Sequence, residues 1–182
     1  MRGISLYRNI LCMTAVVMAL FMGTALAVPR AMTVDDAVIA GIAPGSALSY
    51  VWSIYGEPDG EKTKRTGNYP THLVDYYGEG FVITYDIFGG AQNPLIQSIE
   101  STNAALVMPS GIHVGMKIAE VQQIFSDIQE PFRRDEKNNQ YTSPRFYVEV
   151  SDEKKGIRTV VFDVDKKGVI QKIFIYDRYG ID

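Results

Sequence analysis

Few side chains in this 182-residue chain have the types and spacing that catalysis or metal binding requires. Its only two histidines, His72 and His113, lack the HxH or HxxxH spacing of a typical metal site. No GxSxG motif is present to position a nucleophilic serine, and Ser110 between a proline and a glycine is typical of a turn. We therefore expect no catalytic residue, no metal site and no cofactor.

Carboxylates are more numerous but show no catalytic pattern. The segment 163–168 begins like a calcium loop, but Lys167 and Phe174 stand where that loop needs oxygen ligands, so a hairpin turn is favoured, with Gly168 at a position of positive φ. A glycosidase-type pair depends on spatial position and stays an open alternative. Carboxylates on strands usually mark a solvated face. Those on expected strands are Asp75, Asp86, Glu100, Glu149 and Asp163.

Tyrosines give a better indication of function. The chain contains 11 tyrosines, and tyrosine is enriched in protein interfaces because it combines apolar area with a hydroxyl group. Tyr76 and Tyr77 are adjacent on an expected strand, so they point to opposite faces and at most one belongs to a one-sided core. We expect one of these two, together with Tyr85 and Tyr147, to bind a protein or peptide partner.

A duplication organises the chain that carries these residues. The sequence GIAPGSALSYVWSIYG at 41–56 recurs 70 residues later as GIHVGMKIAEVQQIFS at 111–126. The shared positions are glycines and apolar residues, whereas Trp52 is matched by Gln122. Gly45 and Gly115 match, and each is expected to occupy a tight turn between two helices.

Apolar periodicity assigns the elements around this repeat. In the first half it predicts helices at 34–41 and 48–55, the second capped by Ser46, and strands at 72–77, 81–88 and 95–100. Residues 60–70 are polar and predicted to be a loop. The second half repeats the order with a helix around 118–125, a polar loop at 131–144, and strands at 145–150, 158–165 and 169–176.

These elements predict an α+β fold of two tandem helix-helix-antiparallel-strand repeats sharing one core, either packed as two halves or joined in one continuous sheet with helices on one face. The expected divisions are a signal peptide at 1–27, a first repeat at 28–101 and a second repeat at 102–182.

The N-terminus predicts export. Arg2 and Arg8 precede an uncharged, mostly apolar run at 10–22, and Ala-Leu-Ala at 25–27 suits signal peptidase. The run is shorter than the ~20 residues of a spanning helix, so an uncleaved anchor is the lesser alternative and we expect no transmembrane segment after cleavage. The only cysteine, Cys12, lies inside the run. The remaining chain is mildly acidic without a basic cluster, so nucleic acid is not an expected partner, and its location is periplasmic or extracellular.

The pattern G-I-x-x-G-x-x-h-x-x-V-x-x-I-(Tyr/Phe), with h apolar, is followed by three expected strands in each half. It resembles the modules of the SmpA/OmlA-like outer-membrane assembly lipoproteins and the two halves of the β-lactamase inhibitor protein. This resemblance implies protein binding through the exposed sheet face and no catalytic residues. The sequence thus predicts an exported, non-enzymatic protein-binding module. The alternatives are an exported hydrolase using strand carboxylates and a structural envelope protein.

Overall fold

The fold is dominated by one antiparallel sheet of seven strands. The computed structural model describes residues 28–129, 145–152 and 156–178, so the predicted signal peptide and the predicted loop at 131–144 lie outside the described residues. The strand order is β1-β2-β3-β4-β7-β6-β5. The strands are β1 (Gly60–Thr66), β2 (Tyr69–Tyr77), β3 (Phe81–Asp86), β4 (Leu95–Ser101), β5 (Arg145–Asp152), β6 (Gly156–Val164) and β7 (Ile170–Arg178).

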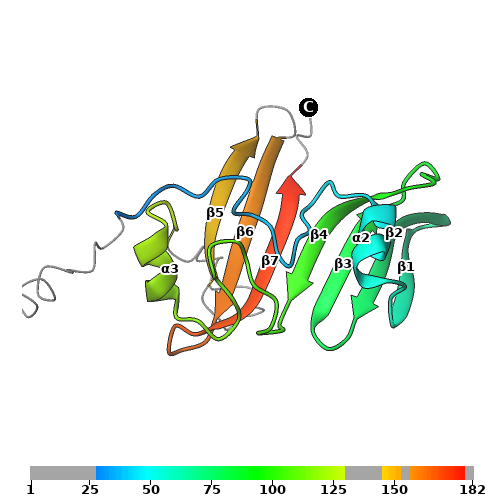
Figure 1. Ribbon diagram of the computed structural model, residues 1–182. Coiled ribbons are helices and arrows are strands. Elements are labelled where there is room, and N and C mark those ends of the chain that lie inside the picture. The colour runs from blue at the N-terminus through cyan, green and yellow to red at the C-terminus, as the bar shows by residue number, and fades with distance from the viewer. Residues whose placement is uncertain (1–27, 130–144, 153–155, 179–182) are drawn as a thin grey trace, which may run out of the picture.

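The described residues form only two short helices, α2 (Leu48–Tyr55) and α3 (Ile118–Ile124). Both lie over the same face of the sheet, which we call the helix face (Figure 1). The chain from residue 28 crosses this face from beside α3 to α2 (Figure 1). The core lies between these segments and the sheet. Within the described part of the chain, neither helix is long and apolar enough to cross a membrane.

The predicted α+β fold class is therefore wrong, because strands far outweigh helices and the expected helix pair of each half is absent. Residues 34–41 form a turn, in which the amides of Asp36 and Ala37 donate to the Thr33 carbonyl, and then a bridge between Ile39 and Ile42. Ala40 and Gly41 both have positive φ, at 51° and 85°, which a helix does not allow. The helix at 48–55 is confirmed, but its N-cap is Ala47 and not the predicted Ser46.

Residues 60–70 do not form the loop that their polar composition predicts. They form strand β1 and the start of β2, joined by a turn at Gly67 with φ 62°. Strand β1 is at the edge of the sheet, and six of its seven residues are exposed. An edge strand with two wet faces has no apolar alternation, so periodicity could not detect it.

The two halves repeat the same backbone hydrogen bonds. The Gly45 amide donates to the Ile96 carbonyl (2.7 Å), and the Gly115 amide donates to the Ile170 carbonyl (2.8 Å). Both glycines have positive φ, at 85° and 98°. The turn at each glycine precedes the one helix that the described residues of its half form, so it does not lie between two helices as predicted. The two helices also begin with equivalent hydrogen bonds. The Leu48 amide donates to the Pro94 carbonyl and the Ile118 amide to the Gly168 carbonyl, both at 2.9 Å.

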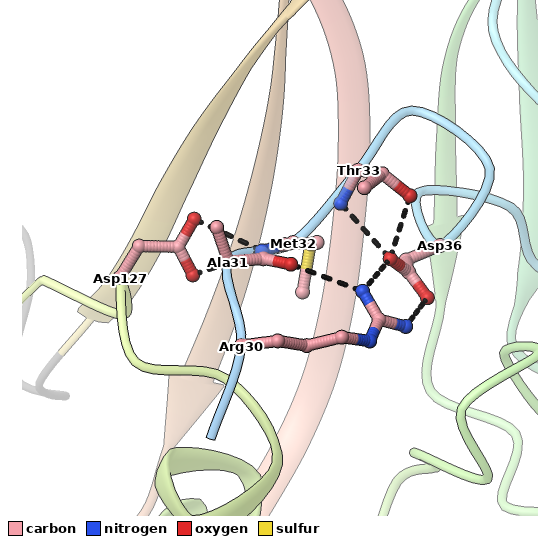
Figure 2. A network of polar contacts seen from close by, with 6 residues as sticks. All are labelled: Arg30, Ala31, Met32, Thr33, Asp36 and Asp127. Carbon is pink, nitrogen blue, oxygen red and sulfur yellow. Dashed lines mark hydrogen bonds and ion pairs between the residues drawn. The ribbon is translucent and has the colours of Figure 1, made fainter. Parts of the chain in front are cut away.

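A polar network fastens the start of the described chain to the second half (Figure 2). The Arg30 guanidinium donates two 2.6 Å hydrogen bonds to the carboxylate of Asp36, which also accepts from the amide and hydroxyl of Thr33. These bonds, chiefly those from Arg30, lower the pKa of Asp36 to about 2. Asp127, just after α3, accepts from the Met32 amide at 3.0 and 3.1 Å. The network therefore joins segments almost 100 residues apart and favours the turn over a helix.

A buried ion pair makes a second connection between the halves. Arg158 on β6 and Asp177 on β7 are register partners, and their side chains meet at 2.8 Å while each residue is only 8% exposed. The same guanidinium donates to the carbonyl of Pro44 at 2.7 Å. The pair thus ties the second-half strands to the turn before α2.

We expect Gly45→Ala and Gly115→Ala each to lower the free energy of unfolding by more than ~1 kcal/mol, because an L-residue is strained at these φ values. The added Cβ at Gly115 would meet no atom within 4 Å, so the loss there would measure backbone strain alone. Gly60→Ala is the control, since Gly60 is not at positive φ and its Cβ would only touch Tyr76 at 3.9 Å. Urea denaturation of the variants measures the effect; equal midpoints for the three variants would contradict it.

Arg158→Met should destabilise the fold by roughly 3–5 kcal/mol, because it leaves the Asp177 carboxylate buried without a counter-charge. The double variant Arg158→Met/Asp177→Leu should recover most of this loss. Arg178→Met is the matched control, because Arg178 is exposed and its contact with Glu149 is 3.4 Å long. Thermal and urea unfolding can rank the three variants. A double variant as unstable as the single one would argue against a charge effect.

Candidate functional site

The four tyrosines proposed as a partner surface lie on opposite sides of the sheet. Tyr77 and Tyr85 are on the helix face, where the Tyr77 ring lies 5.6 Å from that of Tyr55 in α2 and Tyr85 is 0% exposed. Because α2 covers this side of β2 and β3, Tyr77 is the member of the Tyr76–Tyr77 pair that packs against a helix, and the fully buried Tyr85 does not contribute to an exposed surface. Tyr76 is 38% exposed on the other face, and Tyr147 is partly exposed there. We call this other side the open face.

The register aligns six side chains across six neighbouring strands of the open face. Each is the cross-strand partner of the next, and apart from the exposed Tyr76 all are half-buried. Because strands are spaced by ~4.8 Å, the row is about 24 Å long. We call it the cross-strand row; its members, from β2 to β5, are Tyr76, Val82, Glu100, Phe174, Val161 and Tyr147.

Charged side chains and a further ring border the cross-strand row. The Lys172 ammonium lies 3.3 Å from Glu100 and 3.5 Å from Asp163, and Arg145 lies 2.7 Å from Asp163. Phe174 is tilted against the Tyr176 ring, with 5.1 Å between centroids. The sequence alone does not identify Val82, Val161 and Phe174 as members of a binding surface, because their alignment depends on strand register between distant segments.

A buried carboxylate on the helix face forms a second unusual feature. Asp75 on β2 is 0% exposed, and neither of its oxygens has a hydrogen-bond partner among the described residues. Its pKa is raised to about 6, chiefly by burial and in smaller part by the charge of Glu61, its register partner on β1. The nearby Trp52 indole opposes part of this rise, although it does not reach the geometry of a normal hydrogen bond.

Two tyrosines complete what we call the Asp75 cluster, which consists of Asp75, Glu61, Trp52, Tyr77 and Tyr85. The Tyr85 hydroxyl is buried without a partner among the described residues. Burial and then the charge of Asp75 raise the pKa values of both tyrosines, that of Tyr77 to about 12. The Tyr77 hydroxyl donates to the Gly56 carbonyl at 3.3 Å. The cluster therefore holds three uncompensated buried oxygens beneath one short helix.

The corresponding place in the second half is apolar. Ile96 and Ile170 are equivalent because each accepts the bond from its half's turn glycine, and their register partners are Tyr85 and Val164. Ile83 lies two residues before Tyr85 and pairs with Asp75, whereas Phe162 lies two residues before Val164 and pairs with Phe146. Asp75 and Phe146 are therefore equivalent. The differences between the halves are Asp75 for Phe146, Tyr85 for Val164 and Trp52 for Gln122.

The remaining sequence candidates are not brought together. His72 and His113 lie in different halves, and each ring contacts an atom of an adjacent residue. Within the described ranges no three His, Cys, Asp or Glu side chains could hold one metal ion. Asp75 is on the helix face, whereas Glu100, Glu149 and Asp163 belong to the open face. Asp75 faces Glu61 across β2 and β1 but is closed to solvent, whereas Glu100 and Asp163 share the Lys172 ammonium on the open face.

Asp75 should give the protein a stability that falls as pH rises. Its carboxyl binds a proton more tightly when folded (pKa about 6) than at its ordinary value of 3.8, so the fold is most favoured with the proton bound. The contribution is fully present below pH 3.8 and lost as pH rises through 6, amounting to roughly 3 kcal/mol. Asp36 acts in the opposite sense and below this window, because its pKa is lowered.

Asp75→Asn should therefore flatten the dependence of unfolding free energy on pH between 4 and 7. The exposed Asp35→Asn is the control and should keep the wild-type slope. Urea denaturation at several pH values provides the measurement. An unchanged slope in Asp75→Asn would show that the carboxyl is not desolvated as the structure places it.

Comparisons with known proteins give no guide to the chemistry of the cross-strand row or of the Asp75 cluster. No protein-family model, no curated protein and no solved structure matches this chain. The likeness to the SmpA/OmlA-like lipoproteins and the inhibitor halves therefore stays a prediction from the repeated motif.

Proposed function

We propose that this protein is an exported, non-enzymatic module that binds a protein or peptide on its open face. The observation that carries the proposal is the cross-strand row, a line of six partly accessible side chains that runs across six strands opposite both helices. Two of its members are tyrosines and one is a phenylalanine, the residue types that anchor protein interfaces.

The composition of the open face suits a partner segment laid across the strands. A length of about 24 Å accommodates a helix of roughly 16 residues, which rises ~1.5 Å per residue. The apolar positions of the row would contact such a segment. Lys172, Asp163 and Arg145 form ion pairs beside the row and would make a polar rim. The mixed charges would select a partner's orientation more than add affinity.

The sequence adds two supports to this proposal. The repeated motif resembles families in which the exposed sheet face binds proteins, and this resemblance favours the open face as the binding surface. The charged, apolar and small-residue order of the first 27 residues is that of an export signal, which suggests an envelope or extracellular partner. The hydrolase alternative receives less support, because Asp75, the strand carboxylate whose pKa is raised among the side chains that the structure describes, is 0% exposed.

Photo-crosslinking tests the proposal. A benzophenone amino acid at position 76 or 174 should give a discrete adduct in cells, because both positions belong to the cross-strand row. The same group in place of Tyr50 is the matched control, since Tyr50 is 49% exposed but lies on α2 over the helix face. Tyr76→Ala should then weaken binding of the identified partner at least ~5-fold without lowering the melting temperature.

Two results would contradict a binding role of the open face. One is an adduct at position 50 with none at 76 or 174. The other is the absence of any adduct at all three positions when the protein is produced at its natural level, which would favour a structural role.

A further inference from the structure

Asp75 and Glu61 form a concentration of negative charge with no compensating cation. They are register partners on β2 and β1, and neither carboxylate forms an ion pair or a hydrogen bond of normal geometry with a side chain or backbone group of the described residues. The neighbouring lysines of β1, Lys62 and Lys64, alternate to the open face. The sequence of α2, LSYVWSIY, contains no charged residue. Among the described residues, no cationic side chain on the elements around Asp75 therefore neutralises its carboxylate.

Aromatic rings surround this carboxylate on the helix face. Trp52 approaches Asp75 from α2, and Tyr77 and Tyr85 lie close enough for the Asp75 charge to raise their pKa values. The faces of such rings attract organic cations. A carboxylate beside aromatic rings suits an ammonium group on an apolar stem, whereas a metal ion would need three or more ligating side chains, which the described residues do not supply.

We propose that the Asp75 cluster is a binding site for an alkylammonium group, with Trp52 as its outer wall. The ammonium would donate hydrogen bonds to the free oxygens of Asp75, and the alkyl stem would pack against Trp52 and Tyr77. Trp52 is 40% exposed and its side chain lies beside Asp75, so it is the group that the entering ammonium would displace. The site lies on the helix face and does not rest on the function proposed for the open face.

The second half shows that the scaffold does not require this cluster. Phe146, Val164 and Gln122 occupy the equivalent places without a buried charge. A phenylalanine at position 75 would avoid the cost of an unpaired buried carboxylate. The polar residues of the first half therefore oppose stability in a fold that accepts hydrocarbon at the same places, which is the expected mark of a binding site.

Trp52 is the only tryptophan in the chain, so its fluorescence reports this site directly. Titration of the purified protein with n-butylammonium at pH 7.5 should give a saturable change, and n-butanol, its uncharged counterpart, should give none. The apparent dissociation constant should rise at pH 5, where the Asp75 carboxyl is protonated. Nα-acetyl-lysine amide and spermidine distinguish the source, because tighter binding of the former assigns the site to a partner's lysine and of the latter to a free polyamine.

Asp75→Asn should weaken n-butylammonium binding at least ~10-fold, and Asp35→Asn should leave it unchanged. Glu61→Gln provides a second variant in case the first misfolds, since Glu61 is exposed, and it should weaken binding ~3-fold. The proposal is overturned by equal fluorescence changes with the amine and the alcohol, by the absence of a saturable change, or by wild-type affinity in both variants of the cluster.

Discussion

The pairing of β4 with β7 is the interaction on which the rest of the structure depends. Ser98–Ser101 pair antiparallel with Ile173–Tyr176 and join two strand groups, β1–β4 and β5–β7, into one sheet. A separate group of three or four strands would leave β4 or β7 as an unpaired edge strand and would have only a thin core. Ile99 and Ile175, both almost fully buried, meet at this seam on the helix face. The joined sheet therefore provides one continuous surface for the core.

Joining the halves also fixes which surfaces remain for function. The helix face receives α2, α3 and the chain that crosses from residue 28, which Arg30, Asp36 and Asp127 hold in place (Figures 1 and 2). The open face keeps its partly accessible side chains in one plane, because antiparallel alternation places every second residue there. The cross-strand row spans the seam through Glu100 and Phe174, so it exists only in the joined sheet.

One helix and two turns are predictable from the residues within each of these segments. The helix at 48–55 follows from its apolar spacing and from Gly56, which has φ 77° at the helix end. The turn at 165–168 follows from Gly168, which has φ 76°, and the hairpin at 78–80 from its two glycines. In these places the residues that determine the conformation are near neighbours in sequence.

Other features depended on contacts that no local pattern reports. Residues 34–41 have helical apolar spacing, yet Asp36 is held by Arg30 and the chain turns through positive φ at Ala40. Strand β1 lacks apolar alternation because both of its faces are wet. The sequence placed Asp75 among solvated strand carboxylates, whereas α2 buries it. The faces of Tyr76 and Tyr77 could be separated by alternation, but their choice of face required the helix position.

The difference between the halves has a physical explanation in how the fold distributes its stability. The second half fills the equivalents of Asp75 and Tyr85 with Phe146 and Val164, so its core contains no charge at these places. Because the β4–β7 seam joins both halves around one continuous core, apolar burial in the second half can offset the desolvation cost in the first. A single half with the Asp75 cluster would lack this compensation. Joining the two halves in one sheet thus permits a cluster of uncompensated buried oxygens in the first half.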